Sequence, residues 1–334
     1  MTDLPLAALV PTDYVGAAID TFRDAGVYDT DRRITVHDDR TVAVPVSSRP
    51  TGGGYEALVV QGSPERRRSD LASHLRARGF TTREIERAPT AWGVVGDVVL
   101  VEFPAACRRR EAVAAALLEL HGNAHTVLSR EGIEGRCREP TVAVVAGEGP
   151  TETVHREHGV TYALDLAAVM FSPGNQAERA RMGRVVSPGE HVFDMFAGIG
   201  YFALPMAVAG ARVTATEINP DAFDYLLENR DRNDVQDRIS PYLADCRTVR
   251  TAADRVVLGH YDGPAYLESA LDALRPGGTL HCHAAVRLDR RDEPRRRLER
   301  LVDGRDRALE SVSRRTVKTT GERWEHVVLD ARVD

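Results

Sequence analysis

Two acids, with a glycine turn between them, are spaced in this sequence as a nucleoside cofactor site requires. Asp194 ends an apolar run, the turn after it holds Gly198 and Gly200, and Glu217 ends the next apolar run roughly 20 residues beyond the turn. Glycines let the backbone approach a ligand, the following helix offers unpaired N–H groups, and an acid at the next strand tip accepts both hydroxyls of a ribose. The spacing therefore predicts nucleoside binding, with an ordinary tight turn between strand and helix as the alternative.

The glycines alone do not choose the nucleoside. They form the pattern Gly198-x-Gly200-x-x-Ala203, which dinucleotide sites also tolerate. The acid four residues before them favours another cofactor, because DMFAGIG resembles the first motif of class I S-adenosylmethionine enzymes. This resemblance implies that Gly198 and Gly200 line the methionine part of the cofactor, that Glu217 holds the ribose, and that Asp245, at the tip of the third strand, contacts the adenine.

A parallel α/β sheet is needed to position these groups, because ligands of such sheets bind outside the carboxyl ends of the strands. The predicted strands alternate with helical patterns and end in an antiparallel pair: 192–194, 211–216, 239–243, 254–259, 279–286, 311–319 and 326–333. This order predicts a doubly wound, Rossmann-like sheet of about seven strands, the arrangement of class I S-adenosylmethionine-dependent enzymes.

Smaller α/β domains are predicted before that sheet. Residues 1–62 form a small N-terminal α/β domain, residues 63–158 an α+β middle domain, and residues 159–334 the catalytic domain. The stretch 49–68 is rich in Gly, Ser, Pro and Arg and is interrupted by one apolar run at 57–60, so we expect a linker there.

The charge of the chain has two aspects. A net charge of −6 argues against a nucleic-acid partner, because phosphate contacts need cations. Lys318 is the only lysine, however, and the arginines cluster at 66–68, 108–110 and 287–300. These clusters fit either solvated helix faces or phosphate contacts.

Other features of composition bear on the compartment. The four cysteines are far apart and form no Cys-x-x-Cys pair, which indicates neither a zinc ribbon nor a disulfide framework. No apolar run has the 18 or so residues of a membrane span, and the first residues lack the pattern of a signal peptide. We therefore expect a cytoplasmic protein.

The segment FSPGNQAERARM precedes the strand that carries Asp194. Ser172 occupies a helix-cap position and Pro173 the first helical position. Arg179, inside the predicted helix, has the geometry to hold a carboxylate or a phosphate with two hydrogen bonds. A plain cap is the alternative role for Ser172.

Six segments, taken in order, resemble the tRNA wybutosine-synthesizing protein 2 family, especially its archaeal members. They are FSPGNQAERARM, DMFAGIGYFALPMA, TEINPDAFDYLLENRDRN, ADRVVLGHYD, GGTLHCHAAV and WEHVVLDARV. The match covers residues 75–334. The first unit resembles the small N-terminal domain of the related tRNA (guanine-37-N1)-methyltransferases.

The resemblance implies a reaction and its participants. The 3-amino-3-carboxypropyl group of S-adenosylmethionine would pass to carbon 7 of 4-demethylwyosine at position 37 of phenylalanine tRNA, with release of methylthioadenosine. Ser172 and Arg179 would contact the cofactor, Arg179 at its carboxylate, and Glu217 with the pair Asp245 and Cys246 would hold the nucleoside. The partner would be the anticodon loop, the middle domain its platform, and the enzyme a monomer. We expect no metal, and the resemblance identifies no catalytic residue; orientation of the reactants should dominate the rate.

The segment after the fourth strand of the catalytic sheet separates transfer of this group from methylation. Amino-methylating relatives place an Asn/Asp-Pro-Pro-Tyr/Phe motif there, whereas this chain has Leu258-Gly259-His260-Tyr261. The missing motif favours aminocarboxypropyl transfer. Tyr261 is a candidate stacking partner for the substrate base.

Several further residues are candidates for substrate contacts. His281 and His283 lie on one face of the fifth strand near its end, which suggests a metal site or a base, although two ligands with no third nearby make a weak zinc site. The alternative is that they are polar ends of a buried strand or a wall of the pocket for the substrate base. Arg108, Arg109 and Arg110 are predicted tRNA contacts. Two other functions stay open: a tRNA (guanine-37-N1)-methyltransferase, and a non-catalytic tRNA-binding module.

Overall fold

The computed structural model describes residues 4–62, 64, 70–319 and 323–334. It separates into two compact units, Met1–Glu86 and Arg87–Asp334. None of the helices formed by the described residues is long and apolar enough to cross a membrane.

The first unit contains a small antiparallel sheet with strand order β2-β3-β1-β4. Helix α1 buries Ala18 and Phe22 in the core of this sheet. The elements of the unit are β1 (Leu6–Pro11), α1 (Val15–Asp24), β2 (Thr35–Val36), β3 (Thr41–Pro45), β4 (Ala57–Val60), α2 (Leu71–Ala77) and α3 (Thr82–Ile85). Strand β4, which interrupts the predicted linker, pairs with β1 and so belongs to the sheet. Arg66, Arg67 and Arg68 lie outside the described residues.

The second unit begins with a four-stranded sheet of order β5-β6-β7-β8. Its elements are β5 (Trp92–Val95), β6 (Val98–Val101), α4 (Arg110–Leu120), β7 (Thr126–Glu134) and β8 (Glu139–Gly147). Helix α4 connects the parallel strands β6 and β7, and β7 and β8 form a long hairpin. The turn of that hairpin contacts the catalytic sheet: Arg136 pairs with Asp245, and the carbonyl of Cys137 accepts a hydrogen bond from Asn219.

A second hairpin, β9 (Glu152–Glu157) and β10 (Val160–Asp165), lies between the two sheets of this unit in the sequence. The predicted domain boundary at 158/159 falls in its turn and would separate two paired strands. Strand β10 is held to the catalytic part by Asn229 of helix α7 (Pro220–Arg232) and by Asn233, which caps the end of that helix. The Asn229 side chain bonds the backbone N–H and C=O of Ala163, and the Asn233 side chain does the same for Thr161.

The catalytic sheet has seven strands in the order β13-β12-β11-β14-β15-β17-β16. Its strands are β11 (His191–Asp194), β12 (Arg212–Glu217), β13 (Ile239–Leu243), β14 (Ala253–Leu258), β15 (Leu274–Arg287), β16 (Leu309–Thr319) and β17 (Trp324–Val333). The first five are parallel, and β17 and β16 are added antiparallel. The predicted doubly wound sheet and its antiparallel closing pair are confirmed.

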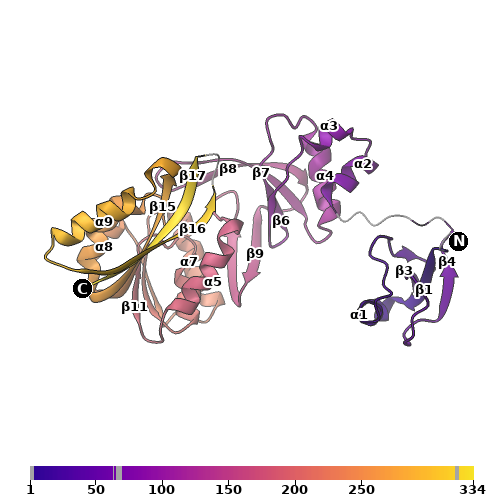
Figure 1. Cartoon of the computed structure of the whole chain (residues 1–334), viewed down its shortest axis with the longest axis horizontal. Helices are drawn as coiled ribbons and strands as arrows, with labels where there is room; N and C mark the ends of the chain where they lie inside the picture. The colour runs from indigo at the N-terminus through magenta and orange to yellow at the C-terminus, as the bar shows by residue number, and fades with distance from the viewer. Residues whose placement is uncertain (1–3, 63, 65–69, 320–322) are drawn as a thin grey trace. The chain divides into compact units, whose positions relative to one another are not determined.

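Both faces of this sheet are buried. Val192 and Val257 belong to one apolar cluster, while their neighbours Phe193, Val256 and Leu258 belong to another, as expected when successive side chains point to opposite faces. The covering helices are α5 (Gln176–Val185), α6 (Ala203–Val208), α7, α8 (Leu267–Ala273) and α9 (Glu293–Asp303) (Figure 1).

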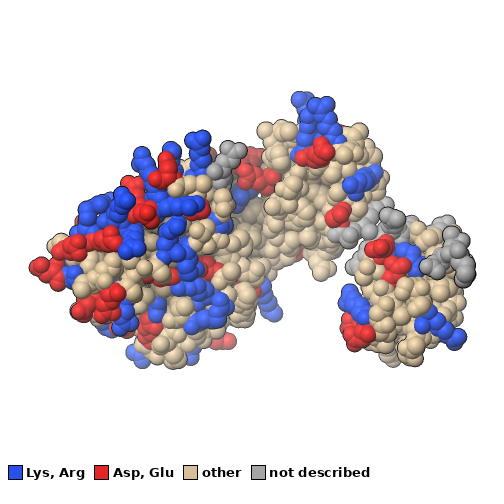
Figure 2. All heavy atoms as spheres, viewed as in Figure 1, with Lys and Arg blue, Asp and Glu red and all other residues tan. Residues whose placement is uncertain are grey.

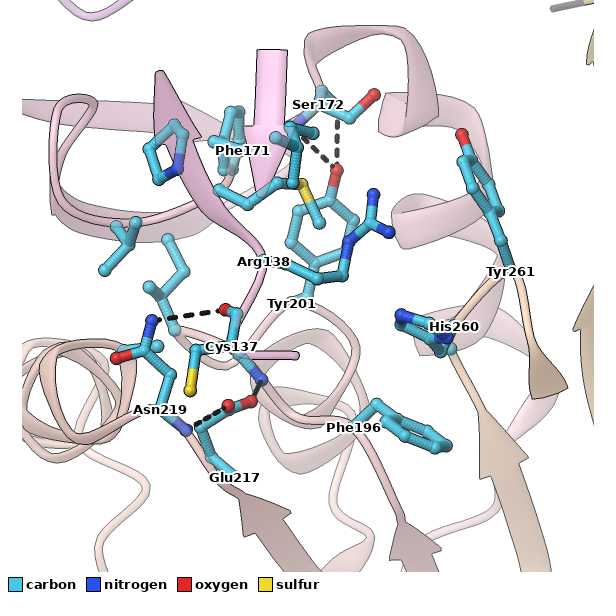
Figure 3. Close-up of a pocket in the computed structure, with 18 of the residues that line it drawn as sticks. Cys137, Arg138, Phe171, Ser172, Phe196, Tyr201, Glu217, Asn219, His260 and Tyr261 are labelled. Carbon is cyan, nitrogen blue, oxygen red and sulfur yellow. Dashed lines mark hydrogen bonds between the residues drawn. The ribbon is translucent and has the colours of Figure 1, made fainter. Parts of the chain in front are cut away.

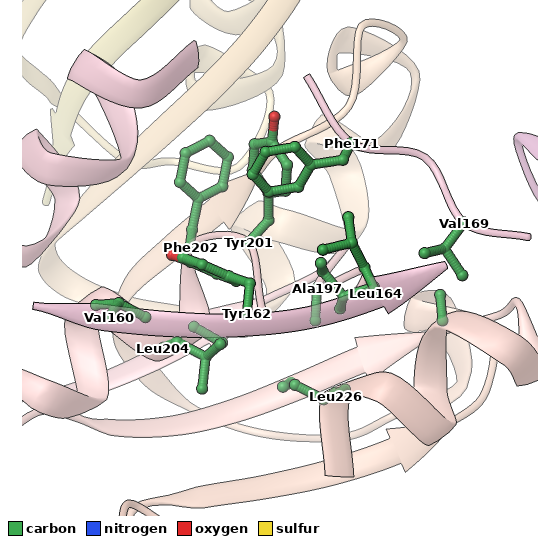
Figure 4. Packing of buried hydrophobic residues seen from close by; sticks show 14 of the residues in the cluster. Val160, Tyr162, Leu164, Val169, Phe171, Ala197, Tyr201, Phe202, Leu204 and Leu226 are labelled. Carbon is green, nitrogen blue, oxygen red and sulfur yellow. The ribbon is translucent and has the colours of Figure 1, made fainter. Parts of the chain in front are cut away.

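Strand β10 packs over the first of these clusters. Tyr162 and Leu164 of β10 lie among Tyr201, Phe202 and Leu204 from the glycine turn and α6 (Figure 4). After β10 the chain crosses the carboxyl ends of the parallel strands, where the segment that begins at Phe171 forms one wall of a cavity.

Candidate active site

A cavity of about 840 Å³ lies at the carboxyl ends of β11, β12, β13 and β14 (Figure 3). Most of its lining comes from segments that are distant in the sequence: the β7–β8 hairpin, the chain from Leu166 to Asn175, the glycine turn, the tips of β12 to β14, and the end of β16. The predicted residues in this lining are Ser172, Gly198, Glu217, Asp245, Cys246 and Tyr261.

Glu217 is held at one end of the cavity by backbone groups. Its Oε2 accepts from the Gly198 N–H at 2.7 Å, and its Oε1 accepts from the N–H groups of Ile218 and Asn219 at 2.8 Å each. Gly198 has a φ of +54°. Burial raises the pKa of Glu217. The acid is thus fixed relative to the glycine turn by its own strand tip.

Asp245 and Cys246 lie beside Glu217 in the cavity lining. Asp245 caps the next turn by accepting from the Arg247 N–H at 3.0 Å. Its carboxylate also pairs with the guanidinium groups of Arg247 and Arg136, and hydrogen bonding to Arg247 is the main reason that the Asp245 pKa is held well below its usual range. Burial raises the pKa of Cys246 to about 12, so its thiol stays protonated at neutral pH and is a packing group.

Asp194 and Gly200 shape the glycine turn from behind and do not line the cavity. Asp194 is fully buried, its Oδ1 accepts from the Phe196 N–H at 3.2 Å, and its Oδ2 has no hydrogen-bond partner among the described residues. Burial raises the Asp194 pKa to about 7. Gly200 has a φ of +99°, and a Cβ there would lie 2.6 Å from Leu204. Their direct contact with a cofactor stays a prediction.

Ser172 lies at the opposite end of the cavity from Glu217 (Figure 3). Its backbone is fixed by Tyr201, whose hydroxyl donates to the Ser172 carbonyl at 2.8 Å and accepts from its N–H at 3.0 Å. Ser172 is at a cap position with Pro173 following, as predicted, but its side chain caps no backbone group. The Ser172 hydroxyl oxygen instead accepts from Lys318 Nζ at 3.0 Å.

The structure does not support the predicted contact of Arg179 with the cofactor. Its side chain is only 1% exposed, does not line the cavity, and forms a two-point ion pair with the buried carboxylate of Glu157. The third guanidinium nitrogen donates to the Ser172 carbonyl at 2.9 Å, and the group packs over the rings of Phe171 and Tyr201. Arg179 does hold a carboxylate with two hydrogen bonds, as predicted, but this carboxylate belongs to Glu157 and not to a cofactor. Arg179 therefore supports the wall of the cavity that includes Ser172.

The segment after β14 forms an aromatic side of the cavity. His260 stacks on Phe196, with ring centroids 5.2 Å apart, and the guanidinium of Arg138 lies 5.6 Å from the centre of the Tyr261 ring. His260 Nδ1 accepts from the Asp262 N–H at 3.0 Å, and burial lowers the His260 pKa. Neutral imidazole is therefore favoured, with its proton on Nε2. Tyr261 lines the cavity, which is consistent with its predicted contact with a base.

His281 and His283 are not pocket residues, and this part of the prediction is wrong. They are 2% and 1% exposed, and neither lines the cavity. Arg255 donates to His281 Nε2, and His281 Nδ1 bonds Asp330, both at 2.5 Å; His283 Nδ1 lies 2.9 Å from His326 Nε2. Because β17 pairs alongside β15, both rings are enclosed, and the two histidines are buried polar residues of the strand. Within the described ranges, no group of three His, Cys, Asp or Glu side chains is arranged to hold a metal.

The arginine clusters are not part of the cavity lining. Arg108 and Arg109 are exposed before α4, and Arg110 packs over Phe103 with its guanidinium carbon 5.8 Å from the ring centre. Their contact with tRNA stays a prediction. In the cluster 287–300, arginines pair with neighbouring acids, among them Arg287 with Asp289, Arg291 with Glu325 and Arg295 with Glu299. Figure 2 shows basic and acidic side chains interspersed over the catalytic part, as on a solvated face.

Several cavity residues were not predicted from the sequence. They are Arg130, Arg136, Arg138, Asn175, Phe196, Asn219, His260 and Lys318. Most come from segments whose approach to the glycine turn depends on tertiary packing. For Lys318 a signal was present, because a single lysine among so many arginines is unusual.

Comparison with known proteins agrees with this geometry. Residues 153–310 match the TRM5/TYW2 methyltransferase domain, and residues 71–151 match the TYW2 N-terminal domain. A tRNA(Phe) (4-demethylwyosine(37)-C(7)) aminocarboxypropyltransferase from Pyrococcus horikoshii is 37% identical over 256 residues, covering 75% of this chain and 91% of the relative. This chain belongs to the TRM5/TYW2 family.

Two solved structures of the TRM5/TYW2 family illustrate the range of likeness. P. horikoshii TYW2 in complex with MeSAdo is 33% identical, with a TM-score of 0.67, and the match covers 78% of this chain and 97% of the other. Trm5b from Pyrococcus abyssi is 29% identical, with a TM-score of 0.73, and the match covers 99% of this chain and 100% of the other. The chain thus combines the TYW2 sequence signal with a likeness to Trm5b that extends through its first unit.

Proposed function

We propose that this enzyme transfers the 3-amino-3-carboxypropyl group of S-adenosylmethionine to carbon 7 of 4-demethylwyosine at position 37 of tRNA(Phe). The observation that carries the proposal is the 37% identity to the P. horikoshii aminocarboxypropyltransferase over 91% of its length. The segment Gly259-His260-Tyr261 supports it, because the Asn/Asp-Pro-Pro-Tyr/Phe motif typical of amino-methylating relatives is missing there.

The residues of the cavity fit the co-substrate. At one end the Glu217 carboxylate is pre-positioned to accept from ribose hydroxyls, and Asp245 and Cys246 form the adjoining wall. At the other end Asn175 Oδ1 is buried without a partner among the described residues, although the residue lines the cavity. A buried acceptor of this kind is costly unless a ligand donor satisfies it. A nucleoside with a charged amino-acid arm offers complementary groups for both ends.

The transfer balances without an additional reactant. Carbon 7 forms a bond to the γ-carbon of the methionine chain, the bond from that carbon to sulfur breaks with its electron pair passing to sulfur, and the proton on carbon 7 is released to solvent. Methylthioadenosine leaves as a neutral molecule. Because the sulfonium is already a good leaving group, the protein contributes mainly by aligning the two reactants.

Binding of tRNA is part of the proposal. We place the anticodon loop at the aromatic side of the cavity, where Phe196, His260, Tyr261 and Arg138 offer surfaces that suit an extended base. The middle domain with Arg108, Arg109 and Arg110 would hold the tRNA backbone. We further propose that the enzyme acts as a monomer in the cytoplasm.

One other function has a specific observation in its favour. The likeness to P. abyssi Trm5b covers 99% of the chain, including the first unit, whereas P. horikoshii TYW2 covers 78%. A tRNA (guanine-37-N1)-methyltransferase is therefore the second candidate.

Position-specific labels separate the two candidates. S-adenosylmethionine labelled in its carboxyl group should label tRNA(Phe) that carries 4-demethylwyosine, and methyl-labelled S-adenosylmethionine should not. Transfer RNA with unmodified guanosine at position 37 serves as the matched acceptor. Methyl label in that tRNA would replace the proposed reaction by guanine methylation.

A further inference from the structure

The only lysine of the 334-residue sequence lies in the wall of the cavity. Lys318 is near the end of β16 and packs closely over the turn that holds Ser172. Its Nζ donates to Ser172 Oγ at 3.0 Å, and a Cβ built on Gly174 would lie 3.7 Å from Nζ. An ammonium group is therefore held at the end of the cavity opposite Glu217.

This end of the cavity has an excess of positive charge. Arg130 also lines it, and the charges of Arg130 and Arg179 act on Lys318. The acids nearby are committed elsewhere: Glu157 pairs with Arg179, and Arg130 pairs with Glu102. Among the described residues no carboxylate forms an ion pair with Lys318, which donates instead to the neutral Ser172 hydroxyl.

The surroundings of Lys318 disfavour an ammonium without an anion. Partial burial, together with the charges of Arg130 and Arg179, lowers the Lys318 pKa. A bound carboxylate would reverse this effect, because an opposite charge at hydrogen-bond distance stabilises the protonated form. Asn175, in the same wall, contributes the buried and unpartnered Oδ1, an acceptor suited to an ammonium group.

We propose that Lys318, together with Ser172, binds the α-carboxylate of the amino-acid arm of S-adenosylmethionine, and that Asn175 Oδ1 accepts from its α-ammonium. The inference rests on the proposed function and deepens it. With Glu217 holding the ribose at one end and Lys318 holding the carboxylate beside Ser172 at the other, the arm is stretched across the cavity. Its γ-carbon is then fixed relative to the base, and Lys318 takes the role first expected of Arg179.

Calorimetry with three ligands tests this assignment in the full-length protein. S-adenosylmethionine has the complete arm, decarboxylated S-adenosylmethionine lacks only the carboxylate, and methylthioadenosine lacks the whole amino-acid group. Lys318→Met should raise the Kd of S-adenosylmethionine about tenfold or more, the usual loss for a hydrogen bond to a charged group. The Kd of methylthioadenosine should stay unchanged, and that of the decarboxylated ligand should change little.

Two companion variants make the result specific. Lys318→Arg keeps the positive charge and should recover most of the affinity for S-adenosylmethionine. Ser172→Ala should weaken S-adenosylmethionine but spare methylthioadenosine. In the wild type, affinity for S-adenosylmethionine should fall as the pH rises through the Lys318 pKa. In Lys318→Met this fall should be smaller, because only the α-ammonium of the ligand still loses its proton.

The other outcomes are distinguishable. If Lys318→Met binds S-adenosylmethionine as tightly as the wild type, or weakens all three ligands equally, the assignment of Lys318 is overturned while the proposed function stands. The same holds if the variant loses affinity only for tRNA. If the wild type itself binds neither S-adenosylmethionine nor methylthioadenosine, the proposed function fails and the inference fails with it.

Discussion

The two ends of the cavity are built in opposite ways. At the Glu217 end, the carboxylates of Glu217 and Asp245 are fixed by backbone N–H groups one or two residues away or in the glycine turn. At the Ser172 end, the wall depends on side chains from β9, α5, the glycine turn and β16, contributed by Glu157, Arg179, Tyr201 and Lys318. The backbone contacts that fix the two carboxylates of the first end therefore come from nearby in the sequence, whereas the second end forms only when distant elements pack together.

The ion pairs at the two ends of the cavity also differ in burial, and so in their expected contribution to stability. The ion pair of Glu157 with Arg179 is almost fully buried, with side chains 2% and 1% exposed. In the ion pairs of Asp245, by contrast, the two arginines are more than half exposed. Removing one partner of a buried pair leaves an uncompensated charge, whereas an exposed pair is screened by water. Substitutions at the Ser172 end should therefore affect folding more than equivalent ones at the Glu217 end.

The largest effect is expected from Glu157→Gln. The substitution keeps the size of the side chain but leaves the buried Arg179 charge without its partner, which should cost about 3–5 kcal/mol of unfolding free energy. Denaturant unfolding measures the loss, with the exposed Glu139→Gln on β8 as the matched control, expected to change stability by less than about 0.5 kcal/mol. Equal effects of the two substitutions would remove the contrast between the ends.

The pH dependence of the same variant sharpens the test. Hydrogen bonds from Arg179, opposed by burial, lower the pKa of Glu157 from 4.5 to about 2. A depressed acid pKa stabilises the fold fully above the unfolded pKa and loses this contribution as the pH falls toward the folded pKa. The stability gap between wild type and Glu157→Gln should thus be constant near neutral pH and narrow below about pH 4.5. A gap independent of pH would mean that the ion pair is not its source.

An intermediate effect is expected at the glycine turn from Gly200→Ala. A Cβ at this position meets Leu204 at 2.6 Å, and the φ of +99° is strained for alanine. We expect a loss of about 1–3 kcal/mol in stability, measured by denaturant unfolding. Gly122→Ala is the matched control, because nothing lies within 4 Å of a Cβ there, and its φ is outside the strained range. A neutral Gly200→Ala would show that the turn can relax.

The difference between the two ends of the cavity also explains which features could be predicted from the sequence. The catalytic sheet and the place of Gly198, Glu217 and Asp245 in the cavity lining were predictable, because each follows from strand periodicity, the glycine turn or an acid at a strand tip. Their contacts with the cofactor stay predictions. The role of Arg179 was not, since its partner Glu157 lies 22 residues away on another element. Spacing also could not show that His281 is enclosed by β17.

The smallest stability effect, and the most informative for function, is expected from Asp245→Asn. The substitution removes the charge that Arg247 and Arg136 neutralise, yet these arginines are 53% and 59% exposed, so water replaces much of what is lost. The unfolding free energy should fall by no more than about 1 kcal/mol. Affinity for methylthioadenosine should nevertheless drop about tenfold in calorimetry, since the adenine would lose a charged acceptor.

The effects of Asp245→Asn and Glu157→Gln should therefore be opposite in kind. Asp245→Asn should mainly weaken ligand affinity, whereas Glu157→Gln should mainly lower the free energy of unfolding. If Asp245→Asn instead unfolds the protein and leaves the affinity of the folded fraction intact, Asp245 acts as a clamp for the β7–β8 turn, and the Glu217 end is as structural as the other.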